Sequence, residues 1–330
     1  MDIKIGLIGL GGVGKKVLDL LPNYKNYKLL DVYSVSGRYD GFALGKVCDT
    51  NFKKLRVKKL SDYINNNIDV FIHATRSFPE IVIPEIEVIV RSGSNVISTS
   101  EYLANLKVNY PKEAVNLNQL AIDNNVSIVG LGVNPGYVFD YLPLSLAVSK
   151  SGVKKIKIKR IVDGSVFGEF VWSSLGLNIS QEEFLSKTSN GKIKAHIGFK
   201  ESATMIIEGL KDKIDSFDET IEPITSKGTG DSLIKKGLVA GFIHKAKTLS
   251  TNGIVLEFEL ILHTNLIESS LDPEDEIFID AATPLNAKFT PGFDAHETTA
   301  SNILNNVELI NRFDPGLWSA TDMQPSKSTK

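Results

Sequence analysis

A glycine-rich turn between an apolar strand and a helix opens this chain and constrains its fold more than any other stretch. The run Ile5–Ile8 is mostly apolar, and a helical pattern begins after a turn whose glycines have G-x-G-x-x-G spacing. In such a turn the first glycine permits the bend, the second lets the backbone approach a pyrophosphate, and the third lets the helix pack on the strand. The helix N-terminus offers free N–H groups to phosphates. We therefore expect a dinucleotide, rather than a purely structural turn, at Gly9, Gly11, Gly12, Val13 and Gly14.

Strands and helices alternate through the first 136 residues. Apolar and β-branched runs predict strands over 27–35 and 69–75, from residue 95, and over 126–131, with helices over 81–91 and 117–124. This alternation predicts an α/β fold, a Rossmann-type doubly wound parallel sheet. Ligands of such sheets bind beyond the carboxyl ends of the strands. The strand ends that matter are Gly9–Gly14, Ser34–Arg38, Ala74–Ser77, Ser98–Glu101 and Gly132–Gly136.

The end of the second strand bears on the choice of cofactor. It offers Ser34, Ser36, Gly37 and Arg38, whereas the nearby acid Asp31 falls inside the strand. An acid at this end would accept a hydrogen bond from a ribose 2′-OH, while an arginine with serine hydroxyls suits a 2′-phosphate. We expect NADP(H) to be preferred and NAD(H) to be possible; a solvated loop role for the arginine is the alternative. Further cofactor contacts are expected from Ala74, Thr75, Thr99, Asn134 and Pro135.

The pattern changes after Asn134-Pro135-Gly136, which is typical of a plain turn but would also set the Asn134 amide against the nicotinamide. Residues 153–162 alternate, with lysines on one face and apolar residues on the other. Strand-like runs over 253–264, 276–281 and 285–289, with a helix near 199–211, predict an α+β second domain with a mixed or antiparallel sheet. We expect domains at 1–136 and 137–293, an amphipathic helix over 297–312 and a flexible tail at 324–330.

Glu101 is the residue best placed for chemistry. A partly desolvated carboxylate at a strand end could act as a general base or hold a cationic amine. A helix-start carboxylate, with Ser98 or Ser100 as the N-cap, explains the same residue equally well. His73 lies inside an apolar strand, where a hydrogen-bonded core residue is a better interpretation than a catalyst.

Arg160 occupies the apolar face of its predicted strand, and an arginine there needs an anion or a paired carboxylate. Asp163 and Glu169 are candidate structural partners, and a substrate carboxylate is the other possibility. His263 and His296 are also candidates, although we expect surface or domain-interface roles for both.

Composition excludes several classes of function. The net charge of −2 gives no electrostatic case for binding nucleic acid or an anionic membrane, and we interpret the basic run 53–59 as a solvated strand face. Cys48 is the one cysteine, so we expect a small buried residue and neither an intrachain disulfide nor a zinc cluster. No apolar run approaches a membrane span, and no signal peptide is recognisable, so we expect a cytoplasmic protein.

Several segments, taken in order, resemble one family. They are His73-Ala74-Thr75, 95–101 (NVISTSE), 132–140 (GVNPGYVFD), 272–277 (DPEDEI), 298–300 (TTA) and 315–317 (PGL). Together they are similar to 2,4-diaminopentanoate dehydrogenase and its relatives, the amine dehydrogenases, whose cofactor domain resembles dihydrodipicolinate reductase. The resemblance covers nearly the whole chain, and the GVNPG segment with the strand-end glutamate is its most specific part.

The resemblance implies NAD(P)-dependent oxidative deamination of an amine or diamine, or reductive amination of a ketone with ammonia. It implies that Glu101 is the catalytic glutamate, that no metal is needed, that the chain forms a homodimer, and that the C-terminal helix, about 294–318, completes the cofactor domain. The substrate-binding residues expected on this basis are Phe139, Arg160, His263 and Thr299.

Two departures from the family pattern stand out: Ser34 replaces the acid of NAD-preferring relatives, and Asp294-Ala295-His296-Glu297 replaces a Gly-Asp pair. Two other functions stay open. One is another NAD(P)H-dependent reductase of a carbonyl or cyclic imine, similar to dihydrodipicolinate reductase. The other is a non-catalytic dinucleotide-binding sensor, in which Glu101 would only cap a helix.

Overall fold

The computed structural model describes residues 2–62, 67–230 and 232–323. The chain divides into two compact units, the first made of residues 1–141 with 294–330 and the second of residues 142–293. The expected tail at 324–330 lies outside the described residues. In the described part of the chain, no helix is both long enough and apolar enough to cross a membrane.

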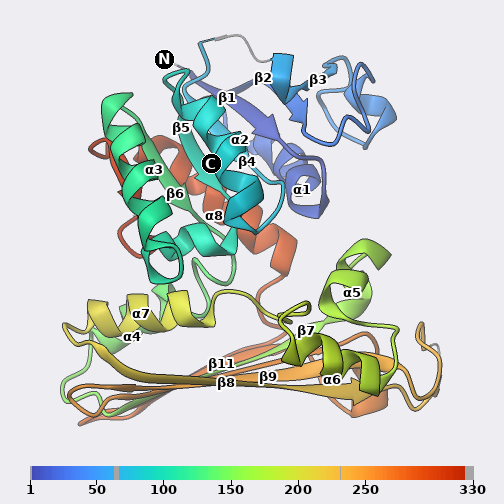
Figure 1. The fold of residues 1–330 in the computed structure, drawn as a ribbon, viewed down its shortest axis with the longest axis vertical. Coiled ribbons are helices and arrows are strands. Elements are labelled where there is room, and N and C mark those ends of the chain that lie inside the picture. The colour runs from blue at the N-terminus through green and yellow to red at the C-terminus, as the bar shows by residue number, and fades with distance from the viewer. Residues whose placement is uncertain (1, 63–66, 231, 324–330) are drawn as a thin grey trace. The chain divides into compact units, whose positions relative to one another are not determined.

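The first unit contains a seven-stranded sheet in the order β13-β6-β5-β4-β1-β2-β3, and every pair of neighbours is parallel (Figure 1). Apolar side chains explain the central strands, since Ile5, Leu7 and Ile8 are fully buried. The strands are β1 (Ile3–Ile8), β2 (Tyr27–Ser34), β3 (Val57–Lys59), β4 (Val70–His73), β5 (Asn95–Ser98), β6 (Ser127–Gly130) and β13 (Gly316–Trp318).

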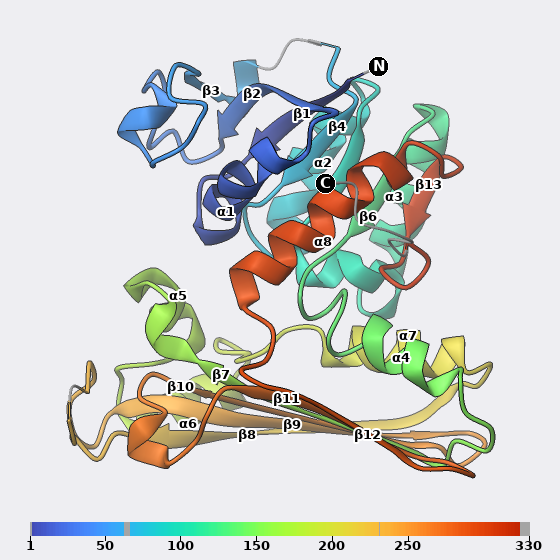
Figure 2. The same cartoon turned by 180° about the vertical axis from the view of Figure 1, so that it is seen from behind.

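Helices cover both faces of this sheet. Figures 1 and 2 show α2 and α3 on one face and α1 and α8 on the other. Their bounds are α1 (Gly12–Leu20), α2 (Pro79–Val90), α3 (Pro111–Asp123) and α8 (Ala295–Ile310). The predicted doubly wound α/β fold is confirmed.

The helix α8 owes its place in the first unit to one apolar face. Ile303, Leu304 and Val307 are fully buried, at the spacing of a helix that packs on one side. Asp294 begins the helix as its N-cap, with a side chain that accepts a hydrogen bond from the N–H of Glu297 at 2.7 Å. This helix and β13 are the C-terminal parts of the first unit.

The second unit contains a six-stranded mixed sheet in the order β12-β11-β7-β10-β9-β8. The pair β7–β10 is parallel and the other neighbours are antiparallel, so the predicted mixed sheet is confirmed. The strands are β7 (Lys155–Asp163), β8 (Ile214–Thr225), β9 (Val239–Ser250), β10 (Val255–His263), β11 (Glu274–Asp280) and β12 (Leu285–Phe289). The helices are α4 (Tyr141–Ala147), α5 (Glu169–Leu175), α6 (Gln181–Ser189) and α7 (Phe199–Gly209).

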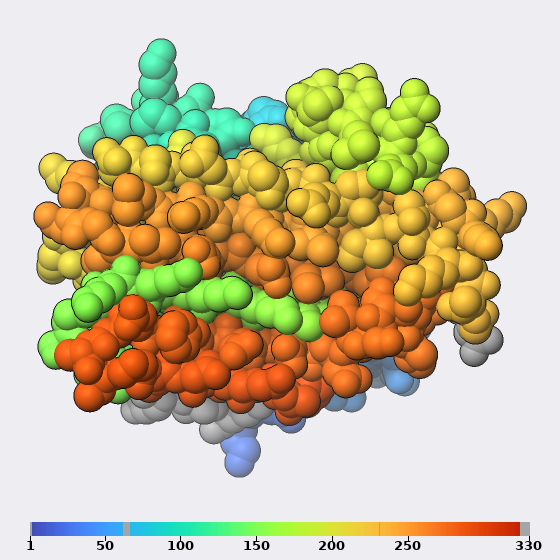
Figure 3. Space-filling view, turned by 90° about the horizontal axis from the view of Figure 1, so that it is seen from below, coloured from blue at the N-terminus to red at the C-terminus, as the bar shows by residue number. Residues whose placement is uncertain are grey.

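The two faces of this sheet differ in character. Ile156, Ile158 and Arg160 of β7 are buried, whereas the lysines that alternate with them are half-buried or exposed. Opposite these lysines, β10 and β11 carry glutamates, for example Glu257, whose carboxylate lies 2.8 Å from Lys155 Nζ. Figure 3 views this charged face, with the strands as neighbouring bands from red-orange through green to yellow.

Three local predictions are wrong. The run 53–59 is a strand only over Val57–Lys59, because residues 51–54 form a turn. Cys48 is half-buried rather than buried. The strands β8 and β9 were missed. β8 is an edge strand whose residues are all half-buried or exposed, so its sequence has no regular alternation of apolar and polar side chains.

Candidate cofactor and catalytic site

The glycine turn between β1 and α1 is built as its spacing predicts. Gly9 has a positive φ of 96°, and a Cβ there would lie 2.1 Å from the carbonyl oxygen of Ala74, at the end of β4. A Cβ on Gly14 would lie 2.1 Å from the carbonyl oxygen of Gly9. Both positions therefore require glycine for close packing of backbone, independently of any ligand.

Gly11 is different, because nothing in the protein requires its small size. Its backbone is extended (φ −75°, ψ −165°), it is exposed, and no atom lies within 4 Å of the position that its Cβ would take. It is the N-cap residue of α1, where free N–H groups and the helix dipole favour an anion. This open cradle fits the pyrophosphate of a dinucleotide.

Gly12 has a neighbour that the sequence did not reveal. A Cβ at this position would lie 2.4 Å from Nε2 of His296, so the half-buried imidazole at the start of α8 packs against the glycine turn. This contact lies within the first unit, and the surface or domain-interface role of His296 stays a prediction.

We predict that Gly11→Ala weakens the dinucleotide without destabilising the fold. Loss of charge-assisted contacts at the pyrophosphate should lower affinity about ten- to hundredfold. The open space around the new methyl group should leave the melting temperature unchanged. Fluorescence titration with NADPH and thermal unfolding measure the two quantities. Gly168→Ala is the matched control, because Gly168 is also an N-cap residue with similar dihedral angles and open surroundings; equal affinity losses in both variants would contradict the assignment.

The end of β2 carries the serines and the arginine expected there. The hydroxyls of Ser34 and Ser36 lie 3.4 Å apart, and the N–H of Arg38 donates to Ser36 Oγ at 3.4 Å. Arg38 is exposed, and its guanidinium carbon lies 5.3 Å from the centre of the Tyr39 ring. Asp31 lies inside β2, as predicted, where it pairs with Lys58 and accepts a hydrogen bond from Tyr33.

One acid near this end was missed. Asp40 Oδ2 lies 3.3 Å from the position that a Cβ on Gly37 would take and 3.9 Å from Lys59 Nζ, while Oδ1 is buried and accepts no hydrogen bond from the described residues. Asp40 also lines a hollow of about 360 Å³ together with the basic side chains of Lys46 and Arg56. Asp40 lies several residues after the end of β2, so it was not considered when an acid was sought at the strand end itself.

Three of the predicted cofactor residues follow β4 and β5. Ala74 is buried at the end of β4, and the hydroxyl of Thr75 donates to Glu85 at 2.8 Å. The N–H of Thr99 donates to the carbonyl of His73 at 2.9 Å. His73 itself is fully buried and hydrogen-bonded, so its predicted place in the core is confirmed.

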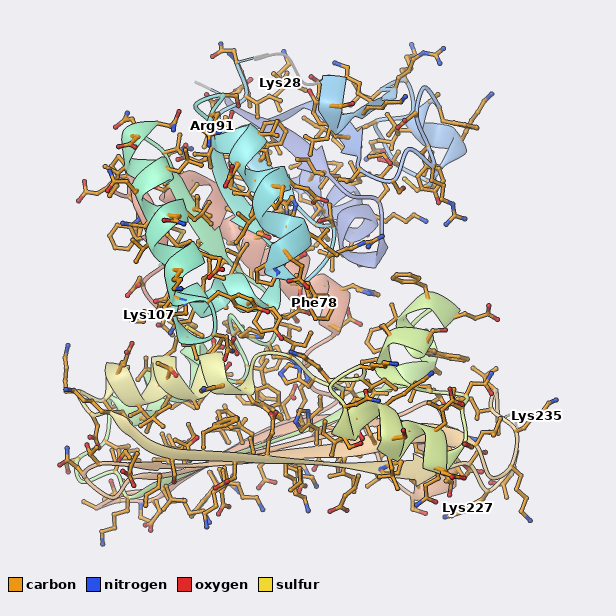
Figure 4. All side chains as sticks on the ribbon, in the orientation of Figure 1. Lys28, Phe78, Arg91, Lys107, Lys227 and Lys235 are labelled. Carbon is orange, nitrogen blue, oxygen red and sulfur yellow. The ribbon has the colours of Figure 1, made fainter. Side chains whose placement is uncertain are left out.

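Glu101 begins the short 3₁₀ helix η4 (Glu101–Val108) directly after β5 (Figure 4, where Phe78 and Lys107 mark the region). The hydroxyl of Ser77 and the N–H of Glu101 itself donate hydrogen bonds to its carboxylate. Its Oε2 atom is buried and has no hydrogen-bond partner among the described residues. Burial raises the pKa of Glu101, and the two hydrogen bonds only partly oppose that rise.

Both interpretations of Glu101 therefore describe part of the geometry. The residue is in the first turn of a helix, but Ser100, the N-cap residue, makes no side-chain capping bond. The hydroxyl of Ser98 instead accepts a hydrogen bond from the N–H of Ser100 at 3.1 Å. A capping role alone leaves the buried, unpartnered Oε2 unexplained.

The turn at Gly132–Gly136 is held by α8. Thr299 Oγ1 accepts a hydrogen bond from the N–H of Val133 at 3.0 Å, and Asn302 Nδ2 donates to the carbonyls of Gly132 and Gly136. Asn302 was missed, although a buried asparagine on the apolar face of a helix is a detectable signal. In this turn Asn134 is half-buried and Pro135 is buried, and Phe139 just beyond it is fully buried.

In the second unit, Arg160 pairs with a residue that the sequence did not suggest. Its Nε lies 3.3 Å from Asp275 Oδ1, both side chains are at most 2% exposed, and Nη2 donates to the carbonyl of Phe293. Of the expected candidates, Asp163 accepts a hydrogen bond from the N–H of Ser165, and the ion pair of Arg160 is with Asp275. Burial raises the pKa of Asp275 even though the guanidinium opposes that rise.

Two histidines are buried in the second unit, and a third, His196, is half-buried. His263, expected at a surface or domain interface, is fully buried; its Nδ1 accepts from the N–H of Asn265, and Nε2 lies 4.0 Å from Glu268. The N–H of His196 donates to Nδ1 of His244 at 3.2 Å. Burial, His244 and Arg160 all hold the pKa of His196 well below its usual value. His196 and His244 were missed, because a histidine in a loop or at an alternating strand position gives no distinct signal.

Among the residues that the structure describes, no group of three histidine, cysteine, aspartate or glutamate side chains is arranged to hold an ion.

The comparison with known families decides the classification. The model of the 2,4-diaminopentanoate dehydrogenase C-terminal domain matches residues 137–329, more than half of this chain. The chain belongs to the 2,4-diaminopentanoate dehydrogenase family. It is 26% identical over 332 residues to 2,4-diaminopentanoate dehydrogenase of Acetoanaerobium sticklandii, covering 97% of this chain and 93% of that protein.

Solved structures support the same fold for this family member. Amine dehydrogenase from Mycobacterium smegmatis has a TM-score of 0.89 at 15% identity and covers 100% of this chain and 98% of its own. Myo-inositol dehydrogenase from Lactobacillus casei, in complex with NAD(H) and myo-inositol, has a TM-score of 0.58 at 13% identity. The match covers 97% of this chain and 91% of that chain. The predicted family is confirmed, and the protein is a dehydrogenase with an NAD(P)-binding fold.

Proposed function

We propose that this protein is an NAD(P)-dependent amine dehydrogenase that deaminates an amine or diamine and, in reverse, aminates a ketone with ammonia. The observation that carries the proposal is the desolvated carboxylate of Glu101, in the same unit as the open cradle at Gly11. The names of the relatives from Acetoanaerobium sticklandii and Mycobacterium smegmatis support this class of substrate.

The mechanism that we infer assigns proton transfers to Glu101. During amination, ammonia adds to the ketone carbon while protonated Glu101 gives a proton to the ketone oxygen. Glu101 then takes a proton from the added nitrogen and returns it to the hydroxyl, which leaves as water. Reduced nicotinamide, when bound, would supply the hydride that reduces the resulting iminium to the amine. During deamination, Glu101 removes a proton from the water that attacks the iminium. Its raised pKa suits a group that must both accept and donate protons.

The proposal keeps 1–136, completed by 294–318, as the cofactor domain and 137–293 as the domain for substrate binding and dimerisation. Phe139, Arg160, His263 and Thr299 are its substrate-binding residues. Arg160 is the one whose charge would favour a substrate with a carboxylate.

A spectrophotometric screen of amines with NADP⁺ and NAD⁺ tests the proposal. Amine-dependent reduction of the cofactor is the expected result. Activity with alcohols or cyclic substrates alone would favour a different reductase, and binding without turnover would favour a dinucleotide-binding sensor.

Cofactor preference gives a second prediction, since we propose that NADP(H) is preferred. Arg38→Ala should weaken NADP(H) about ten- to hundredfold by removing a charge-assisted contact to the 2′-phosphate, with little effect on NAD(H). Asp40→Asn, in the same loop, is the matched control and should not weaken NADP(H). Equal losses of both cofactors in Arg38→Ala would reject the assignment, and a selective loss of NAD(H) in Asp40→Asn would favour recognition of the ribose 2′-OH.

A further inference from the structure

A buried polar network lies beneath the two loops that carry Ser77 and Glu101. Its centre is His73, fully buried at the end of β4. Nε2 of this imidazole lies 2.7 Å from Glu85 Oε2 on α2, and Nδ1 lies 3.0 Å from Ser98 Oγ at the end of β5. The mechanism above gives His73, Glu85 and Ser98 no role.

A continuous series of contacts leads from this network to the carboxylate. Ser98 Oγ accepts a hydrogen bond from the N–H of Ser100, and the Ser100 hydroxyl donates to the carbonyl of Ser77 at 2.5 Å. The Ser77 hydroxyl in turn donates to Glu101. All of these residues belong to the first unit. The series alternates between side-chain and backbone atoms, so it can fix positions but cannot pass a proton along its length.

Stability does not account for a polar pair at this place. Replacing a buried charged or strongly polar pair by apolar side chains is often neutral or stabilising. Hydrogen bonds, however, fix distance and direction, which apolar packing does not. The pair joins β4 to α2 at the point where the loop carrying Ser77 begins, and through Ser98 it also fixes the loop that carries Glu101.

We propose that the His73–Glu85 pair is a positioning unit that holds Ser77 against Glu101. The inference deepens the proposed function and rests on it for its catalytic consequence. His73 and Glu85 are positioning residues, since they act on the carboxylate through Ser98, Ser100 and Ser77.

The test compares two variants of the holoprotein with a matched control. Ser77→Ala removes the last hydrogen bond directly. The double variant His73→Leu with Glu85→Leu removes the pair and leaves two apolar side chains that keep the core filled, although it also removes the acceptor of the Thr75 hydroxyl and the partner of Ser98 Oγ. Ser94→Ala is the control, because its hydroxyl makes a buried hydrogen bond to the carbonyl of Ile68 at the other end of the same two strands.

The main readout is the pKa of Glu101, measured by infrared difference spectroscopy across the pH range. The carbonyl band of the protonated carboxyl group is assigned to Glu101 because it should be absent from Glu101→Gln. The Ser77 hydrogen bond lowers the pKa of Glu101. Ser77→Ala and the double variant should therefore both raise this pKa, and Ser94→Ala should leave it unchanged. An unchanged titration in the double variant, with a shift in Ser77→Ala, would overturn the proposal, as would an unchanged titration in Ser77→Ala.

Turnover provides the second readout. The double variant should lose about tenfold to a hundredfold in kcat, because a small misplacement of a catalytic group costs that much. Infrared titration needs no substrate, so it still decides the positioning role if no amine is turned over. If the protein turns over no amine but the variants show the expected shifts in the pKa of Glu101, the proposed function is wrong and the positioning unit is supported.

Discussion

Replacing Glu101 with glutamine is expected to lower kcat for deamination by about 10²–10⁴-fold, the usual contribution of general acid–base catalysis. Glutamine keeps the size and shape of the side chain but cannot accept a proton. NADP(H) affinity should hardly change, since the glycine turn and Arg38 lie at other strand ends. Steady-state kinetics and a fluorescence titration measure the two effects. Near-normal turnover in a correctly folded variant would exclude the mechanism proposed here.

The pH dependence of the same variant separates catalysis from capping. Because burial raises the pKa of Glu101, the acidic limb of the kcat/KM profile should lie above the range of an ordinary glutamate and should disappear in Glu101→Gln. The raised pKa also means that folding favours the protonated form. The wild-type protein should therefore lose stability, relative to the variant, as pH rises from the unfolded to the folded pKa.

A capping carboxylate predicts the opposite, a loss of about 1 kcal/mol of stability in Glu101→Gln with little effect on turnover. Glu113→Gln is the control for helix-start carboxylates, since Glu113 lies exposed in the first turn of α3. Urea unfolding across the pH range compares the two variants.

Arg160→Met is expected to destabilise the protein by about 3–5 kcal/mol, because it leaves the carboxylate of Asp275 buried without its ion-pair partner. The double variant with Asp275→Leu should recover most of this loss, since both members of the pair are then apolar. The free energy of unfolding in urea is the measurement. Lys155→Met on the opposite face of the same strand is the control; its half-buried pair with Glu257, which water still reaches, should be worth about 0–1 kcal/mol.

The double variant also tests whether Arg160 recognises a substrate carboxylate. If it does, KM for oxo acids or amino acids should rise while KM for uncharged amines stays constant. If the arginine is structural, the ratio of the two KM values should not change. Equal stability of Arg160→Met and Lys155→Met would contradict the buried-pair account.

Local patterns predicted the cofactor fold well because they contain the information that it needs. The glycine spacing, the apolar strands and the amphipathic segment of α8 all express short-range periodicity. The place of His73 in the core followed from the same reasoning, since its neighbours in the strand are apolar.

The missing parts depend on contacts between distant segments. Asp275 faces Arg160 because β11 pairs with β7 in one register, and sequence alone does not fix register. The closeness of His196, His244 and Arg160 depends on the packing of a loop against the second sheet. For Glu101, position predicted a strand end, but the buried Oε2 and the Ser77 hydrogen bond depend on tertiary structure.

The discontinuity of the first unit has a consequence for biosynthesis. Thr299 and Asn302 hold the turn at Gly132–Gly136, and β13 adds the outermost strand beside β6. A ribosome makes these segments only after the whole of residues 142–293 has been synthesised. The nascent chain must therefore keep an incomplete sheet edge at β6 while the second unit is made, and the finished cofactor unit can form only after β13 has emerged.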